Sequence, residues 1–238
     1  MNLIRIETQR LVIRNFSDRD ASAYFQLLSH PEVHCFVSEK IDSIEQAKQQ
    51  IEHKKTLDDG SELAVALKDT DELIGTLFGV WEKDTFCVCW NFLAAYGKKG
   101  YAYESAKAYL DFLFNRMGAR RIYAYVEDDN LSSQHLCQKL GMRLEGIFKE
   151  FVSFINQPDG SPLYENTMQF AILKKEWENT LDDDFDLKTF HRNLLEIGPV
   201  QFPVLRKYMH ERLQKATKGG AGANVIGLGA PPVLSCFL

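Results

Sequence analysis

The chain of 238 residues has a formal net charge of −5 and a hydrophobic share of 45%, which is ordinary for a globular protein with a hydrophobic core. The acidic balance excludes the overall electrostatic signature of a nucleic-acid-binding protein. Five scattered cysteines do not form the disulfide framework that small secreted domains use. The amino terminus lacks the long apolar core of a signal peptide, so a cytoplasmic protein is predicted.

Hydrophobic periodicity and turn residues predict alternating strands and helices. Strands are predicted at 10–16, 62–67, 73–81, 85–93, 121–126, 142–155 and 165–173. Helices are predicted at 18–28, 43–55, 102–117 and 132–140. Ser17 and Ser43 are the predicted N-cap residues of the first two helices. This order predicts a mixed α/β fold around a central strand–helix–strand unit.

A glycine-containing loop joins the central predicted strand to the longest predicted helix. It spans 95–102 and reads AYGKKGYA. Unpaired N–H groups and the helix dipole favour an anion at a helix N-terminus, and glycine lets a phosphate approach the backbone. Ligands of open α/β sheets bind at this end of a strand, so the loop is predicted to bind a pyrophosphate. The competing interpretation is an ordinary turn whose two lysines face solvent.

The loop lacks two known nucleotide-binding patterns. It has no Gly-Lys-Ser/Thr of a Walker loop, and it lacks the third glycine and later acidic residue of a dinucleotide fingerprint. Nucleoside triphosphates and NAD are therefore disfavoured. Cys87 and Cys89 are interpreted as small apolar residues, because no second Cys/His pair completes a zinc site. No metal is expected.

Four stretches carry a family resemblance. They are ETQRLVIR at 7–14 followed by Asp20-Ala21, GKKGYA at 97–102, NLSS at 130–133 with KLGM at 139–142, and LEG at 144–146. Together they resemble the GNAT superfamily of acetyl-CoA-dependent N-acetyltransferases, most closely the branch that acetylates the N-termini of ribosomal proteins. The resemblance covers about residues 3–175. It implies the GNAT fold, with a mixed central sheet of about seven strands flanked by about four helices.

The resemblance implies acetyl-CoA as the cosubstrate. Its pyrophosphate is expected on the backbone N–H groups of Lys98, Lys99, Gly100, Tyr101 and Ala102. Either lysine is also expected to reach the 3′-phosphate of the adenosine. No metal is implied.

Four further positions have implied roles. The backbone of Phe92 and Leu93 is expected to pair with the pantetheine arm where the two central strands splay apart. Asn130 is expected to hydrogen-bond the same arm. Ser133 is expected to be the general acid that protonates the CoA thiolate. Helix capping is the competing interpretation for Asn130 and Ser133.

The sequence departs from the family pattern at two positions. Gly97 replaces the Gln or Arg that begins the pyrophosphate loop. In some ribosomal-protein enzymes a carboxylate serves as the base where this chain has Val152. Glu150 is the expected substitute, because it is predicted to lie on the same strand face. His135 and Glu127 are further candidates, and a backbone-held water that relays the proton would also serve.

The sequence predicts three segments: an acetyltransferase domain at 1–175, a helical C-terminal extension at 176–218 and a flexible Gly/Ala/Pro-rich tail at 219–238. An acidic linker is predicted at 182–186, followed by amphipathic helices at 187–197 and 200–213. These helices either pack on the domain's own sheet or form a dimerisation or substrate-lid hairpin. A monomer and a homodimer are both compatible with this pattern. The tail is predicted not to span a membrane.

The predicted function is the transfer of an acetyl group from acetyl-CoA to a primary amine by direct attack. The acceptor is a protein N-terminus or a small-molecule amine. Its groove is expected to comprise the segment 29–41, with His30, Glu32, His34 and Phe36, and the hairpin near Tyr164. The two departures from the family pattern suggest the alternative, a catalytically weak acyl-CoA-binding sensor or scaffold. No nucleic-acid or membrane partner is expected.

Overall fold

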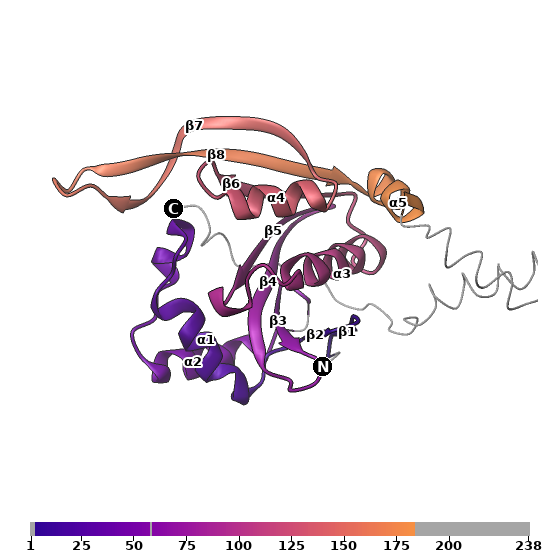
Figure 1. Ribbon diagram of the computed structural model, residues 1–238, viewed down its shortest axis with the longest axis horizontal. Helices are drawn as coiled ribbons and strands as arrows, with labels where there is room; N and C mark the ends of the chain where they lie inside the picture. Colours follow the sequence, from indigo (N-terminus) through magenta and orange to yellow (C-terminus); the bar gives the residue numbers. More distant parts are fainter. Residues whose placement is uncertain (1–2, 58, 184–238) are drawn as a thin grey trace, which may run out of the picture. The chain divides into compact units, whose positions relative to one another are not determined.

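The computed structural model describes residues 3–57 and 59–183, in which eight strands form one sheet (Figure 1). Their order across the sheet is β1-β2-β3-β4-β5-β6-β8-β7. The strands are β1 Arg5–Glu7, β2 Leu11–Arg14, β3 Glu62–Leu67, β4 Leu73–Glu82, β5 Thr85–Phe92, β6 Arg121–Glu127, β7 Arg143–Asn156 and β8 Pro162–Leu173. The predicted mixed α/β fold is confirmed, and β1 is an eighth strand that the sequence pattern did not predict.

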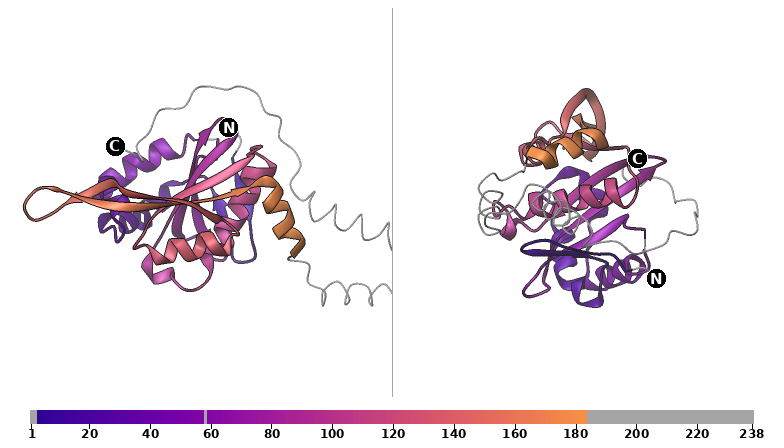
Figure 2. Two further views of the ribbon diagram at one scale, coloured as in Figure 1. Left: turned by 90° about the horizontal axis from the view of Figure 1, so that it is seen from above. Right: turned by 90° about the vertical axis from the view of Figure 1, so that its right-hand side faces the viewer.

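Helices lie on both faces of this sheet (Figures 1 and 2). They are α1 Ala21–Ser29, α2 Ile44–Lys54, α3 Tyr101–Asn115, α4 Leu131–Lys139 and α5 Lys174–Asp183, with short 3-10 helices η1 Asp18–Asp20, η2 His34–Glu39 and η3 Ala94–Tyr96. The Ser43 side chain caps α2 by accepting a hydrogen bond from the Gln46 N–H, as predicted. The Gln46 side chain reaches back to the N–H of Asp42, one residue further than a capping box requires.

The sheet separates two hydrophobic cores, because successive side chains of a strand point to opposite faces. On β3, Val65 belongs to one core and Ala64 to the other. The first core includes the predicted stripe of α3, of which these residues are at most 1% exposed: Ala106, Tyr109, Leu110 and Leu113. The second core receives α1 and α2 through Tyr24, Leu27, Ala47 and Ile51. The sheet is thereby fixed on both sides.

The parallel pair at the centre of the sheet is short. Thr85–Cys87 of β5 pair with Arg121–Tyr123 of β6, and there the described pairing between these strands ends. Beyond that point β5 continues beside β4 to Phe92, whereas β6 continues beside β8 to Glu127. We call this divergence the splay. It leaves one edge of β5 without a strand partner at the end that leads into the glycine loop, as the family resemblance implied.

Helix α5 follows β8 directly and begins two residues before the predicted domain boundary. Trp177 on α5 is 2% exposed and packs against Phe114 of α3, with ring centroids 5.9 Å apart. The predicted acidic linker therefore begins within a helix, since Asp182 and Asp183 belong to α5. The predicted helices at 187–197 and 200–213 and the tail lie outside the described residues. Within the part of the chain that is described, no helix has the length and apolarity needed to cross a membrane.

A buried charge cluster holds the start of α1 against the sheet. Arg14 of β2 donates two hydrogen bonds to the Asp20 carboxylate, at 2.8 and 2.9 Å. Its Nε donates to Asp71, in the turn between β3 and β4, at 2.8 Å. The side chain of Asp20 is 1% exposed and that of Arg14 is 10% exposed. Arg19 binds the same Asp71 from the surface.

Candidate active site

The predicted anion loop lies at the carboxyl end of β5, where η3 leads into α3 (Figure 1). Gly100 is the N-cap residue of α3 and has a left-handed φ of 82°. No side chain caps this helix end, so the N–H groups of its first turn remain directed at the loop. The helix dipole adds partial positive charge at the same place. The loop therefore has the local geometry of an anion site.

Arg10 adds a fixed positive charge to the loop and was missed by the sequence reasoning. Its Nη1 donates to the backbone oxygen of Lys99 at 2.9 Å, and its Nε donates to Glu104 of α3 at 2.6 Å. The guanidinium also lies 4.5 Å from the centroid of the Tyr101 ring. The first loop position, Gly97, offers no side chain, and the guanidinium of Arg10, paired with the Glu104 carboxylate, lies against the loop from a segment far away in sequence. Its only sequence signal was its place in the ETQRLVIR stretch.

The two loop lysines differ in their surroundings. Lys99 folds back on the loop, where its ammonium donates to the Ala95 carbonyl at 3.1 Å and lies 5.2 Å from the Tyr96 ring centroid. Lys98 is exposed on the turn, with a left-handed φ of 59°. To bind a phosphate, Lys99 must therefore give up its hydrogen bond to the Ala95 carbonyl. Lys98 is exposed and can reach a phosphate from the turn.

Phe92 and Leu93 direct their backbones to different places. The Leu93 N–H donates to the Ile74 carbonyl at 2.9 Å, and its own carbonyl accepts from the Tyr96 N–H at 2.9 Å. Alternate residues of an antiparallel ladder direct their polar groups to opposite sides, so Phe92 directs its N–H and carbonyl into the splay. The Phe92 ring covers Gly75, where an added Cβ would lie 2.4 Å from Cδ1 of the ring. Phe92 thus presents backbone groups to the splay, and Leu93 is committed to β4 and the loop.

Ser133 is held from two sides in the first turn of α4. Its backbone N–H donates to the side chain of Asn130, the N-cap residue, at 3.1 Å. Its hydroxyl oxygen accepts a hydrogen bond from the indole N–H of Trp90 on β5, at 3.2 Å. Because indole only donates, the hydroxyl proton of Ser133 remains available to another acceptor. The predicted capping role of Asn130 is present, and it places Ser133 beside the β5 edge of the splay.

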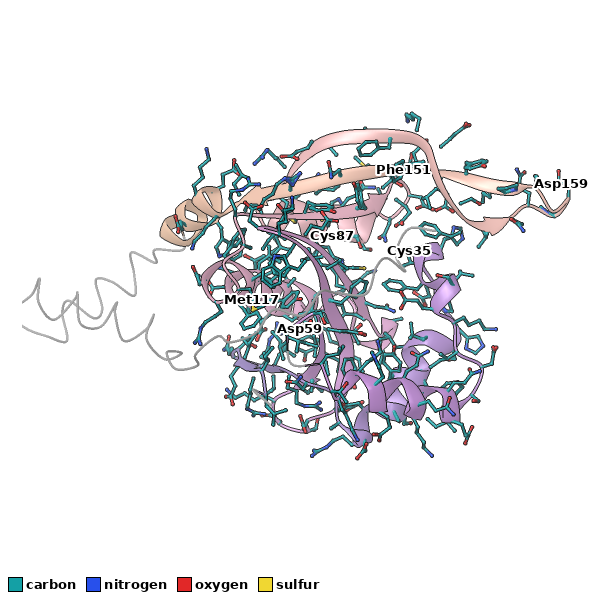
Figure 3. All side chains as sticks on the ribbon, turned by 180° about the vertical axis from the view of Figure 1, so that it is seen from behind. Cys35, Asp59, Cys87, Met117, Phe151 and Asp159 are labelled. Carbon is teal, nitrogen blue, oxygen red and sulfur yellow. The ribbon has the colours of Figure 1, made fainter. Side chains whose placement is uncertain are left out.

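A second polar group of residues, which we call the carboxylate cluster, comprises Glu127, Thr167, Glu165 and His34. Glu127 ends β6 and is directly opposite Thr167 of β8; they are 6% and 1% exposed. Glu165 lies two residues before Thr167 and shares its face of the sheet. Its Oε1 is hydrogen-bonded to Nδ1 of His34 on η2. Figure 3 shows η2, marked by Cys35, beside the β7/β8 hairpin.

The carboxylate cluster joins the predicted acceptor groove to the residues around Ser133. His34 belongs to the segment 29–41 predicted for the groove, and Glu165 follows the predicted Tyr164. The pKa of Glu127 is raised, mainly because the carboxyl group is buried and also because the charge of Glu165 is nearby. Hydrogen bonds from its own backbone N–H and from the Asn130 side chain lower this pKa by less. The Asn130 N–H donates to the Glu127 carbonyl at 3.1 Å, so Glu127 adjoins the residue that caps the helix of Ser133.

Glu150 does not share a strand face with Val152. The register of β7 on β8 shifts between Phe148 and Val152, and Glu150 has a left-handed φ of 48° within this bulge. The alternation of side chains is interrupted there, so the geometric basis for choosing Glu150 was wrong. Glu150 is exposed. His135, on α4, is exposed as well.

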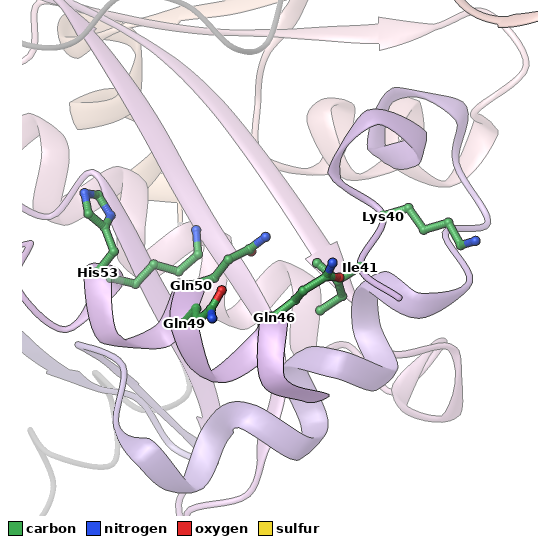
Figure 4. Close-up of a pocket in the computed structure, with 7 residues that line it drawn as sticks. Lys40, Ile41, Gln46, Gln49, Gln50 and His53 are labelled. Carbon is green, nitrogen blue, oxygen red and sulfur yellow. The ribbon is translucent and has the colours of Figure 1, made fainter. Parts of the chain in front are cut away.

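A separate cavity of about 490 Å³ lies along α2 (Figure 4). It is lined by Lys40, Ile41, Gln46, Gln49, Gln50, His53 and Lys54. Lys40 and Ile41, at the end of the groove segment 29–41, are the predicted positions that line it, and several of its polar groups are already paired, such as Gln50 with the Tyr24 hydroxyl. Among the residues that the structure describes, no three His, Cys, Asp or Glu side chains are grouped to hold a metal ion.

The splayed sheet, the anion loop and the serine held beside them are the arrangement of an α/β acyltransferase. The acetyltransferase (GNAT) domain family matches residues 10–143, and the chain belongs to this family. It is 33% identical over 176 residues to the uncharacterized N-acetyltransferase YnaD of Bacillus subtilis (strain 168). This match covers 73% of this chain and 99% of YnaD.

Solved structures share the fold. An acetyltransferase of the GNAT family from Bacillus anthracis matches with a TM-score of 0.64 and 27% identity, over 72% of this chain and 99% of that one. RimL, a ribosomal alpha-N-protein acetyltransferase, matches with a TM-score of 0.58 and 16% identity, over 72% of this chain and 94% of that one. The predicted GNAT family is confirmed by the family match and by YnaD, and RimL shares the fold.

Proposed function

We propose that this acyltransferase moves the acetyl group of acetyl-CoA to a primary amine. The observation that carries the proposal is the splay, with an anion loop at the end of β5 and an oriented hydroxyl on α4 beside it. Acetyl-CoA has a thioester at one end of a long amide-bearing arm and a pyrophosphate at the other. The thioester matches the oriented hydroxyl, the arm matches the splay, and the pyrophosphate matches the anion loop. The acceptor is a protein N-terminus or a small-molecule amine, and RimL, whose name describes a ribosomal-protein acceptor, has the same fold.

The donor is proposed to lie along the open edge of β5. The backbone N–H groups from Lys98 to Ala102 bind the pyrophosphate, supported by the charge of Arg10. The backbone of Phe92 pairs with the pantetheine amides, as a missing strand would. Lys98 or Lys99 contacts the 3′-phosphate.

Ser133 is proposed to be the general acid. The amine nitrogen attacks the thioester carbonyl, a C–N bond forms, the C–S bond breaks, and the Ser133 hydroxyl gives its proton to the departing sulfur. Proton transfer by a positioned side chain contributes about 10²- to 10⁴-fold in rate. Trp90 orients the hydroxyl, and Asn130 fixes the helix turn that carries it.

Replacing Gly100 with alanine is expected to weaken CoA binding about tenfold or more, measured by calorimetry, through lost contacts of the kind worth about 1.5–3 kcal/mol each when charged. A Cβ at this position would lie 3.3 Å from an Arg10 nitrogen, and the backbone would hold the alanine at a left-handed φ of 82°. Gly118→Ala is the matched control, since Gly118 has a φ of 76° with no atom within 4 Å of an added Cβ. An equal loss of CoA affinity in both variants would contradict the loop assignment.

Trp90→Phe is expected to lower kcat about 2- to 10-fold, the effect of losing one neutral hydrogen bond. The donor KM is expected to stay unchanged, because the indole N–H orients Ser133 and does not bind CoA. The measurement is steady-state release of free thiol. Trp81→Phe, on the exposed end of β4, is the control for loss of an indole. A rise in donor KM with constant kcat would assign Trp90 to CoA binding instead.

The same thiol assay, run with a panel of amines, tests the proposed reaction. Release that depends on both acetyl-CoA and an amine supports it. Calorimetric binding of acetyl-CoA without amine-dependent release would instead support the sensor or scaffold alternative. Absence of binding would contradict both.

A further inference from the structure

Two buried oxygen atoms of the carboxylate cluster are unsatisfied. Glu165 Oε2 and Thr167 Oγ1 have no hydrogen-bond partner among the described residues. Thr167 is 1% exposed, and an unpaired buried polar group costs about 1–3 kcal/mol. Both atoms belong to side chains two residues apart on one face of β8. Such groups are rare in native structures, and bound hydrogen-bond donors would satisfy them.

We propose that these two atoms bind the nitrogen of the acceptor amine and that Glu165 removes its proton. This inference rests on the function proposed above and names the acceptor side of that site. His34 is the positioning residue, because its ring holds Glu165 Oε1 and leaves Oε2 for the ligand. An ammonium group has the donors that a carboxylate and a hydroxyl oxygen accept.

The register of the hairpin brings a carboxylate of β8 to the position where the family pattern places the base on β7. Val152 of β7 is directly opposite Glu165 of β8, and opposite residues of an antiparallel pair have neighbouring side chains on one face. The carboxylate that the family pattern led us to expect at Val152 is thus supplied by the facing strand. Glu127 is directly opposite Thr167, and its carbonyl accepts from the N–H of Asn130, whose side chain caps the helix of Ser133, so the amine site and Ser133 lie on adjoining elements.

Charge selects the class of acceptor. Glu127 and Glu165 each bring a carboxyl group to the carboxylate cluster, and the half-exposed His34 is bonded to Glu165. A cationic amine is attracted, and an amine with an adjacent carboxylate is repelled. The acceptor is therefore a peptide N-terminus or an alkylamine, in which no carboxylate neighbours the nitrogen, and a free amino acid is disfavoured.

The proton transfers balance with these residues. The ammonium gives one proton to Glu165 Oε2, from which it passes to water. The nitrogen lone pair then forms the C–N bond as the C–S bond breaks. Sulfur takes the Ser133 proton, and a second proton from nitrogen replaces it. The net products are the amide, free thiol and one proton released to solvent.

The test measures amine binding without turnover. Butylamine, a tripeptide amide and free alanine are titrated by calorimetry into the full chain saturated with CoA. Glu165→Gln, which keeps the shape of the side chain, is expected to weaken binding of butylamine and the tripeptide amide by about 10- to 100-fold, the loss of a charged hydrogen bond. Glu150→Gln is the matched control and is expected to bind both as wild type does.

Thr167→Val provides a second variant, because its hydroxyl has no hydrogen bond to another described residue. It is expected to keep wild-type thermal stability and to weaken amine binding several-fold, within the range of one neutral hydrogen bond. With an amine that is turned over, Glu165→Gln is expected to lower kcat at least about 10²-fold, while CoA affinity stays constant.

Several outcomes overturn the inference: wild-type amine binding in Glu165→Gln, no amine binding to the wild type, or free alanine binding as tightly as the tripeptide amide. Weaker binding in Glu150→Gln with wild-type binding in Glu165→Gln would return the role to Glu150. Glu165-dependent amine binding without any release of thiol by the wild type would support the amine site and contradict the proposed transfer reaction.

Discussion

Ser133→Ala is expected to lower kcat for acetyl transfer about 10²-fold or more, the lower end of the effect of a general acid. The hydroxyl is the only group removed. The backbone N–H of Ser133 keeps its bond to Asn130, so α4 retains its cap. CoA affinity is therefore expected to stay at the wild-type value. The measurement combines steady-state thiol release with calorimetry of CoA binding.

Ser132→Ala is the matched control, since this neighbouring serine is exposed on the same helix turn. It is expected to retain wild-type kcat. In a double variant, Trp90→Phe is expected to have no further effect once the Ser133 hydroxyl is gone, because the two side chains act through one hydrogen bond. Wild-type turnover by Ser133→Ala, or additive effects in the double variant, would contradict the assignment.

Arg14→Leu is expected to lower the free energy of unfolding by about 3–5 kcal/mol, the cost of removing one partner of a buried ion pair. Asp20 would remain buried with its charge unpaired, and Asp71 would lose its bond to the guanidinium. The pKa of Asp71 is lowered in the folded chain: burial raises it, and hydrogen bonding and charge from Arg14 outweigh this. The measurement is urea unfolding at neutral pH.

Arg19→Leu is the control, because Arg19 binds the same Asp71 with a side chain that is 67% exposed. Surface ion pairs contribute about 0–1 kcal/mol, so this variant is expected to unfold close to the wild-type urea concentration. An equal loss of unfolding free energy in Arg14→Leu and Arg19→Leu would contradict the prediction that the buried ion pair contributes more than the exposed one.

The elements that the sequence predicted best are those whose pattern is local. The stripe on α3 repeats at helical spacing, and the caps of α2 are adjacent in sequence, so both follow from short windows. β1 was missed because three residues with one partly buried side chain carry almost no alternation. The splay was expected from the family resemblance, and no local pattern encodes it.

The site residues that were missed depend on pairing between distant segments. Arg10 meets Lys99 across 89 positions, and the missed Glu165 meets His34, which was predicted for the acceptor groove, across 131. Neither contact has a periodic signal. Glu150 was misplaced because its prediction assumed unbroken alternation along β7, whereas a bulge inserts extra residues there. The hairpin register, which decides which carboxylate faces Val152, is visible only in the folded chain.

The short pairing of β5 with β6 also has a mechanical consequence. Three residue pairs join two antiparallel ribbons, β1 to β5 and β6 to β8. Few hydrogen bonds resist a change of twist along this line, so the sheet can flex there. A molecule bonded along the open edge of β5 would stiffen that line. The rigidity that aligns the loop residues with those near Ser133 would then come partly from the donor itself.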